Sequence, residues 1–197
     1  MQSLPRIKFL IAPTSDAWTE QTLANMDIIL LDHSNCERKA ASVALKFMTR
    51  YPSNTKLVHE LTHLAQEELL HFQQVNTILN DRNIPLAPLN APPYGATLTK
   101  QIRKPEPDRF LDMLLVSALI EARSHERLGL IGQHCEDLEL AEFYRSLMES
   151  EARHYGLYWV LADTYFDRTV VTERLEAIAV IESQILSTLH PEPRVHS

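Results

Sequence analysis

The chain of 197 residues contains few glycines, few cysteines and no long apolar run. Only four glycines interrupt a sequence in which Ala, Leu, Glu and Gln are frequent, a composition that favours helices over sheet or disorder. The two cysteines, Cys36 and Cys135, are too few for a disulfide framework, and we expect both to be reduced. No stretch approaches the ~20 apolar residues of a membrane span, and Met1 to Arg6 lack the pattern of an export signal. These absences predict a helical, cytoplasmic protein that does not enter the membrane.

The formal net charge of −7 argues against indiscriminate binding of nucleic acid, but the charge is distributed unevenly. Two runs, Arg38 to His59 and Arg82 to Pro105, contain basic residues and no acidic residue, whereas the run from Glu136 to Glu182 is rich in acids. One end or face of the protein is therefore expected to be basic.

Apolar residues recur at helical spacing in five blocks, at residues 16–51, 54–82, 108–133, 138–166 and 171–189. The predicted starts carry residues that cap or open helices, which are Asp16, Asn54, Asp108 and Asp137. Residues 84–107 have no apolar period and hold six of the eleven prolines, so we expect one long crossover between the second and third helices. The fifth block is predicted to be an additional C-terminal helix outside the main four.

Four of the predicted helices carry a glutamate inside an otherwise apolar stripe. In the second and fourth blocks a histidine follows this glutamate one turn later. A bare buried carboxylate costs several kcal/mol unless something compensates its charge, so the repeated pattern calls for a shared cation. The residues in question are Glu37, Glu68, His71, Glu121, Glu151 and His154.

The order Glu, Glu-x-x-His, Glu, Glu-x-x-His is the ligand set of carboxylate-bridged di-iron bundles, and these donors suit iron or manganese. The midpoint between Glu37 and Glu68 falls at the predicted turn Pro52-Ser53, and the midpoint between Glu121 and Glu151 falls at Glu136. At ~1.5 Å per residue, all four carboxylates then lie ~22 Å from their turns. We therefore predict one all-α domain, residues 1–197, folded as a ferritin-like four-helix bundle around two metal ions.

Several individual assignments stay open. Glu126 also lies on an apolar stripe and is an alternative to Glu121 as the ligand from the third helix. His33 and His125 are either partners of the ligands or packed core residues. Three tyrosines fall near the predicted site, either as core packing or as hydrogen-bond donors and carriers of redox equivalents: Tyr144, Tyr155 and Tyr158.

Four runs of sequence carry a resemblance to a known family: His33 to Ala41, Glu67 to Phe72, Leu119 to Arg127, and Glu151 to Tyr155. With these runs the chain resembles the tRNA 2-methylthio-N6-isopentenyladenosine hydroxylase family, over roughly Leu10 to Tyr165. The resemblance implies a non-haem di-iron monooxygenase that hydroxylates the isopentenyl group of a hypermodified adenosine next to the tRNA anticodon. By the matching motifs, the resemblance also implies that the four glutamates and two histidines listed above are the iron ligands.

The resemblance also implies dioxygen as co-substrate, tRNA as partner, and an external electron donor such as a ferredoxin-type protein or a flavoprotein reductase. Tyr94, in the proline-rich crossover, is a candidate for the mouth through which a splayed-out base enters. Seven basic residues are candidate phosphate contacts, although a solvated helix face is the alternative for most of them: Arg38, Lys39, Lys46, Arg50, Lys56, Arg103 and Lys104.

Two rival functions fit the same helical pattern. The first is a rubrerythrin-like peroxidase or iron-handling protein, although the chain has no Cys-x-x-Cys pair for a rubredoxin centre. The second is a metal-free helical interaction module, in which arginines pair with the buried carboxylates: Arg123, Arg127 and Arg153.

Overall fold

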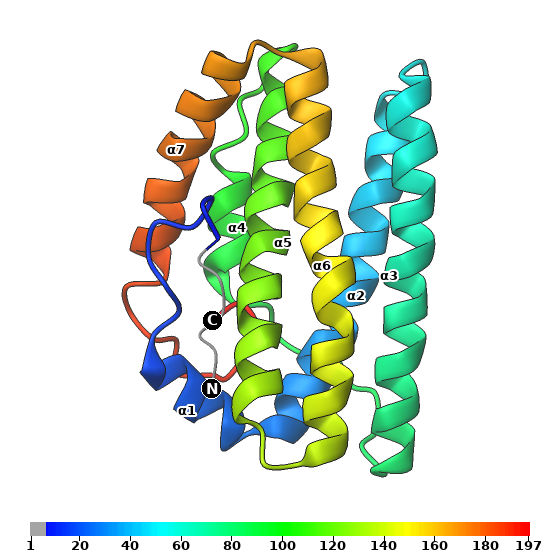
Figure 1. Ribbon diagram of the computed structural model, residues 1–197, viewed down its shortest axis with the longest axis vertical. Helices are drawn as coiled ribbons and strands as arrows, with labels where there is room; N and C mark the ends of the chain where they lie inside the picture. The colour runs from blue at the N-terminus through cyan, green and yellow to red at the C-terminus, as the bar shows by residue number, and fades with distance from the viewer. Residues whose placement is uncertain (1–6) are drawn as a thin grey trace. The chain divides into compact units, whose positions relative to one another are not determined.

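The computed structural model describes residues 7–197, so Met1 to Arg6, from which we predicted no export signal, lie outside it. The described residues form seven α-helices and no strand (Figure 1). They fall into two compact units. Unit 1 consists of the chain up to Ala24, Pro92–Glu192 and His196–Ser197, and unit 2 consists of Asn25–Ala91 and Pro193–Val195. The expectation of one domain over residues 1–197 stays a prediction.

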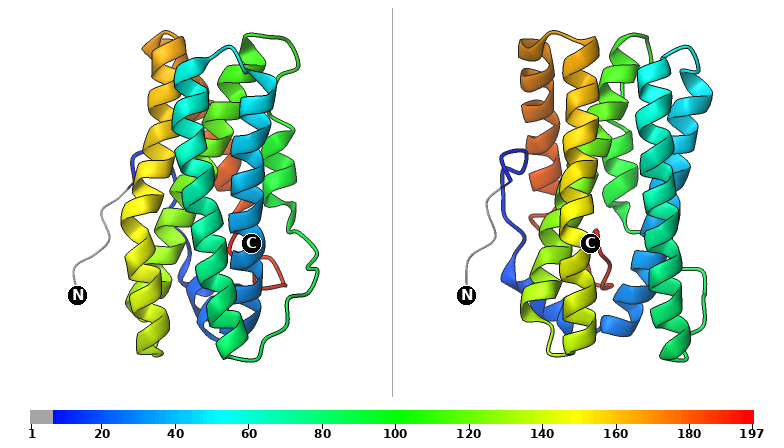
Figure 2. Two further views of the ribbon diagram at one scale, coloured as in Figure 1. Left: turned by 90° about the vertical axis from the view of Figure 1, so that its right-hand side faces the viewer. Right: turned by 45° about the vertical axis from the view of Figure 1, so that its right-hand side comes forward.

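Unit 2 is a hairpin of two long helices, α2 (Met26–Arg50) and α3 (Thr55–Asp81), which lie side by side in both views of Figure 2. A short turn through Pro52 and Ser53 joins them, because proline cannot continue a helix. The facing stripes are apolar and almost fully buried, with Ala44 and Phe47 on α2 and Leu57 and Leu61 on α3. The second predicted block and the turn before it are therefore confirmed, although the side chain of Asn54 makes no capping hydrogen bond at the start of α3.

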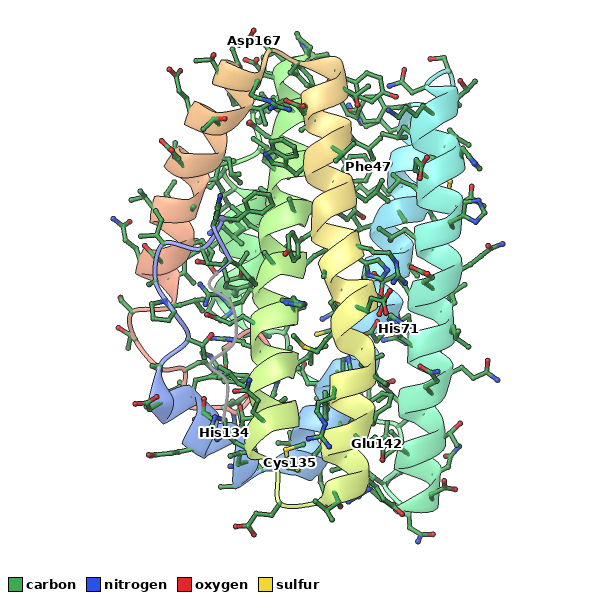
Figure 3. All side chains as sticks on the ribbon, viewed as in Figure 1. Phe47, His71, His134, Cys135, Glu142 and Asp167 are labelled. Carbon is green, nitrogen blue, oxygen red and sulfur yellow. The ribbon has the colours of Figure 1, made fainter. Side chains whose placement is uncertain are left out.

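Unit 1 is built on the hairpin of α5 (Asp108–His134) and α6 (Leu138–Tyr165). Helices α1 (Asp16–Leu23), α4 (Pro93–Thr99) and α7 (Arg168–Ile185) pack against α5 in addition to α6, and Phe110 to Leu119 are all buried. Asp137 accepts hydrogen bonds from the first amides of α6, as predicted for a capping residue. Asp167, labelled in Figure 3 at the start of α7, caps that helix in the same way.

Three details of the predicted helices were wrong. The first block is two helices, because α1 ends at Leu23 and the backbone of Asn25 leaves helical geometry before α2 begins. Ser15, not Asp16, caps α1, since its hydroxyl accepts a hydrogen bond from the amide of Trp18. The C-terminal helix begins at Arg168 and ends at Ile185, so it is shifted towards the N-terminus of the predicted block.

The proline-rich crossover contains structure that its composition did not predict. Helix α4 forms within it, opened by Pro93 at a position where proline is favoured. Tyr94 is buried rather than part of a surface mouth, and its hydroxyl lies 3.1 Å from Oε1 of Glu182. None of the described helices is long and apolar enough to cross a membrane.

Candidate metal centre

In unit 2 the predicted ligands Glu37, Glu68 and His71 converge on one point of the α2–α3 hairpin. Nδ1 of His71, the residue labelled on α3 in Figure 3, lies 3.5 Å from Oε2 of Glu37 and 3.8 Å from Oε2 of Glu68. One ligand atom from each of the three residues lies within 4.8 Å of the others. All three side chains are buried, so two carboxylates and an imidazole share a space from which bulk water is excluded.

The charges of this cluster support one another. Burial alone raises the pKa of a carboxyl group, yet His33 and His71 hold the pKa of Glu37 well below its ordinary value. Burial also lowers the pKa of an imidazole, but Glu37 and Glu68 together raise the pKa of His71 to about 9. The cluster therefore favours a positive charge beside its carboxylates, which a bound metal cation would supply.

His33 belongs to this cluster as a neighbour of a predicted ligand. Its Nε2 lies 2.5 Å from Oε1 of Glu37, one helical turn further along α2, and its side chain is buried. Of the two readings left open by the sequence, partner or packed residue, the geometry favours the partner. Such neighbours hold a metal-binding side chain in one orientation.

Unit 1 contains a second cluster of the same composition. Glu121 lies on α5, and Glu151 and His154 lie one turn apart on α6. Nδ1 of His154 lies 3.9 Å from Oε1 of Glu151, and one ligand atom of Glu121 lies within 4.8 Å of one of His154. All three side chains are buried. Each unit therefore carries one glutamate on its first long helix and a Glu-x-x-His pair on its second.

Glu126, the alternative to Glu121, takes part in a different network. It accepts hydrogen bonds from the amide and the hydroxyl of Thr14 and from the guanidinium of Arg123. Arg123 also binds Glu182 through two hydrogen bonds and donates to the carbonyl of Ala12. The geometry therefore favours Glu121 as the α5 ligand. Arg123 pairs with Glu126 and Glu182, whereas the metal-free module required it to pair with the carboxylates of the predicted ligands.

The residues present fit a transition-metal ion. Carboxylate oxygens and imidazole nitrogens are donors that iron and manganese accept, and a carboxylate pair with one imidazole leaves coordination positions for other ligands. Buried acidic groups gathered this closely would otherwise be costly. Apolar neighbours on α3, Leu64 and Val75, keep the surroundings of the unit 2 cluster dry.

The candidate phosphate contacts are scattered over both units. Five of them lie in unit 2 with exposed side chains, which are Arg38, Lys39, Lys46, Arg50 and Lys56. Arg103 in unit 1 is already engaged, since it binds Asp112 through its amide, Nε and a terminal nitrogen and also pairs with Asp108. Lys104 beside it is exposed. Arg103 therefore ties the crossover to α5, which makes it a weaker candidate than the others.

Helical hairpins that carry buried glutamates beside histidines are typical of ferritin-like proteins, and the predicted fold class is confirmed. The particular family follows from comparison. The chain belongs to the family described as tRNA-(MS[2]IO[6]A)-hydroxylase (MiaE), whose family model matches residues 1–197. The resemblance found in the sequence is therefore confirmed, and with it membership of an enzyme family.

Two curated relatives share a name. Both are called tRNA 2-(methylsulfanyl)-N(6)-isopentenyladenosine(37) hydroxylase. The relative from Pseudomonas putida is 40% identical over 100% of this chain and 96% of its own length. The relative from Salmonella typhimurium is 29% identical over 98% of this chain and 89% of its own length. A solved structure, described as protein 43 with aldehyde deformylating oxygenase activity from Synechococcus, is 48% identical, with a TM-score of 0.94 over 97% of this chain and 96% of that one.

Proposed function

We propose that this protein is a dioxygen-dependent monooxygenase that hydroxylates the isopentenyl group of 2-methylthio-N6-isopentenyladenosine next to the tRNA anticodon. The observation that carries the proposal is the pair of matching clusters, Glu37 with Glu68 and His71, and Glu151 and His154 with Glu121. Membership of the hydroxylase family supports the reaction and its substrate.

The two units are proposed to form one domain in which the two clusters share two iron ions. This part of the proposal is supported by the equal distance of the four glutamates from their turns and by the ligand order of di-iron bundles. Bound iron would supply the activation of dioxygen, a one-electron chemistry that side chains cannot perform alone. The six ligands are Glu37, Glu68, His71, Glu121, Glu151 and His154, with manganese as the alternative metal.

The protein's own side chains would orient the ligands and keep water out. His33 holds the Glu37 carboxylate from one turn away, so that this ligand presents the same oxygen at each binding event. Buried apolar residues on the stripes of α3 and α6, such as Leu64 and Leu147, surround the ligands with hydrocarbon. A dry, apolar environment also suits an isopentenyl group, which has no polar atom to pair.

The tRNA is proposed to contact the exposed face of α2 and the start of α3. From Arg38 to Arg50 every exposed residue of α2 is basic or uncharged, in a protein whose formal net charge is −7. The phosphates would contact four residues on α2 and one beyond the turn, which are Arg38, Lys39, Lys46, Arg50 and Lys56. Lys104 and Arg103 are minor candidates, because Arg103 already pairs with Asp112. We propose that the reaction takes place in the cytoplasm and that a ferredoxin-type protein or a flavoprotein reductase donates the electrons.

The test is a reaction with purified, iron-loaded protein, a chemical reductant, dioxygen and tRNA that carries the unhydroxylated nucleoside. Mass spectrometry of the digested tRNA should show the nucleoside heavier by one oxygen atom, and the Glu68→Leu variant should give none. Protein that consumes dioxygen but leaves the nucleoside unchanged would contradict the substrate assignment and favour a peroxidase or iron-handling role.

A second candidate function follows from the solved structure at 48% identity, whose description names aldehyde deformylating oxygenase activity. The same metal chemistry would then act on a small aldehyde, for which the basic face of α2 has no use. Incubating the iron-loaded protein with a reductant, dioxygen and a small aldehyde separates the two candidates, because loss of the formyl carbon would be detected only if the aldehyde is a substrate.

A further inference from the structure

A continuous series of aromatic rings in unit 1 runs from His125 on α5 to the partly exposed Trp159 on α6. The rings of His125 and Tyr155 lie edge to face with centroids 5.7 Å apart. Tyr155 contacts Phe9 at 5.5 Å, and Phe9 stacks on Trp159 at 6.3 Å. All three spacings fall within the range of aromatic contacts.

Along the helices, the inner end of this series lies within one turn of two predicted ligands. His125 follows Glu121 by one turn on α5, and residues four apart on a helix are surface neighbours. Tyr155 follows His154 directly on α6. At the outer end Trp159 is partly exposed, and the guanidinium of Arg168 lies 5.2 Å from its ring centroid.

Tyrosine and tryptophan are the two side chains of this series that can lose and regain one electron, whereas Phe9 fills the space between them. We propose that Tyr155 and Trp159 form an escape route for oxidising equivalents when the metal centre reacts with dioxygen and no tRNA is bound. This inference rests on the proposed function, because dioxygen at a reduced di-iron centre is the oxidant.

The electrons balance as follows. Reduction of one dioxygen to the level of water takes four electrons, of which two come from the two ferrous ions. In the hydroxylation the other two come from the carbon–hydrogen bond of the substrate. Without substrate, Trp159 would supply them in two one-electron steps through Tyr155. The oxidised indole then takes an oxygen from water and releases protons to solvent, which leaves a hydroxylated tryptophan, one water molecule and two ferric ions.

The chain contains a natural control for this route. Its other tryptophan, Trp18, is almost fully buried against the guanidinium of Arg127, whose carbon lies 4.4 Å from the ring centroid. Trp18 lies on α1, whereas the rings in contact with Tyr155 are those of Phe9 and His125. Oxidation that travels through Tyr155 should therefore mark Trp159 and spare Trp18.

The experiment uses the full chain loaded anaerobically with ferrous iron and then exposed to dioxygen without tRNA. Peptide mass spectrometry should find Trp159 heavier by one oxygen atom and Trp18 unchanged, and freeze-quenched samples should show an organic radical in electron paramagnetic resonance spectra. Tyr155→Phe keeps the ring that packs against Phe9 but removes the redox-active phenol. In this variant, modification of Trp159 should fall to the level of iron-free protein, with the melting temperature unchanged.

A second variant, Phe9→Leu, tests the same route without changing Tyr155. Because this substitution interrupts the ring contacts, it should also lower the modification of Trp159. The inference is overturned if Trp159 is modified equally in wild-type and Tyr155→Phe protein, as a diffusible oxidant would produce. It is also overturned if iron-loaded wild-type protein consumes dioxygen and Trp159 stays intact, a result that leaves the hydroxylase proposal standing. Protein that binds no iron would overturn both.

Discussion

Nε2 of His33 lies 2.5 Å from Oε1 of Glu37, one helical turn away on α2. Because both side chains are buried, this contact fixes the orientation of the carboxylate. Replacing His33 with alanine should weaken iron binding by about 10- to 100-fold, the usual cost of losing such a neighbour. Titration of metal-free protein with ferrous iron under anaerobic conditions measures the change.

His59 offers the matched control for this substitution, since it is an exposed histidine on α3 of the same unit. His59→Ala should bind iron as wild-type protein does. Unchanged affinity in His33→Ala would show that His33 is only a packed core residue, as the alternative reading of the sequence allowed.

A second prediction concerns the buried ion pair between Arg123 and Glu182. Nε and a terminal nitrogen of Arg123 lie 2.8 and 2.9 Å from the two carboxylate oxygens, and both side chains are fully buried. Glu182→Ala leaves the fully buried guanidinium of Arg123 with Glu126 as its remaining acidic partner, so the free energy of unfolding should fall by about 3 kcal/mol. Urea denaturation measures it, with the exposed Glu176→Ala on the same helix expected to change little. A loss no larger than that of the control would refute the pairing.

Asp112 should make stability depend on pH at the acidic end. Burial raises the pKa of the Asp112 carboxyl, but hydrogen bonds from Arg103 and Arg174 hold it below its ordinary value of 3.8. The stabilisation that ionised Asp112 gives the folded state is therefore complete above about pH 4. It is lost as the pH falls through the lower pKa that Asp112 has in the folded protein. Asp112→Asn should cost about 2 kcal/mol at neutral pH, because hydrogen bonds between charged groups are removed while both arginines can still be hydrated.

Denaturation of both proteins between pH 7 and pH 2.5 checks this sign. The difference in unfolding free energy between wild type and Asp112→Asn should stay constant down to about pH 4 and shrink below it. A difference that instead grows on acidification would contradict the assignment.

The basic face of α2 predicts how tRNA binding responds to charge and salt. Lys46 is exposed in the acid-free run, so Lys46→Glu should weaken binding and reduce the slope of log affinity against log salt by about one or more. Arg153→Glu, an exposed site on α6, serves as the control. Filter binding at several salt concentrations would distinguish them, and equal effects of the two variants would mean that α2 does not face the tRNA.

The sequence alone predicted the features that follow from helical periodicity. Glu68 and His71 interrupt an apolar stripe one turn apart, and the structure buries both against Glu37 because helical spacing places them on one face. The same holds for Glu151 and His154. Each of these pairs is set by contacts within one hairpin, where sequence distance determines position.

The features missed by sequence analysis depend on contacts between distant segments. In the sequence Arg103 looks like a surface cation in an acid-free run. In the structure the crossover folds back onto α5, where Arg103 forms an ion pair with Asp112. Phe9 lies before the first periodic block, so nothing in the pattern placed it between Tyr155 and Trp159. Tyr94 likewise gave no sign of its buried partner Glu182, which follows it by most of the length of unit 1.

The iron content of wild-type, Glu68→Leu and Glu151→Leu protein after anaerobic loading tests the central claim most directly. If ligands from both hairpins bind two iron ions, wild-type protein should contain two irons per chain. Each variant should then lose much of its iron, and the loss should be the same whichever hairpin is changed. If wild-type protein binds no iron and either leucine variant is more stable than wild type, the carboxylates are unpaired core charges, and the metal centre proposed for this protein does not exist.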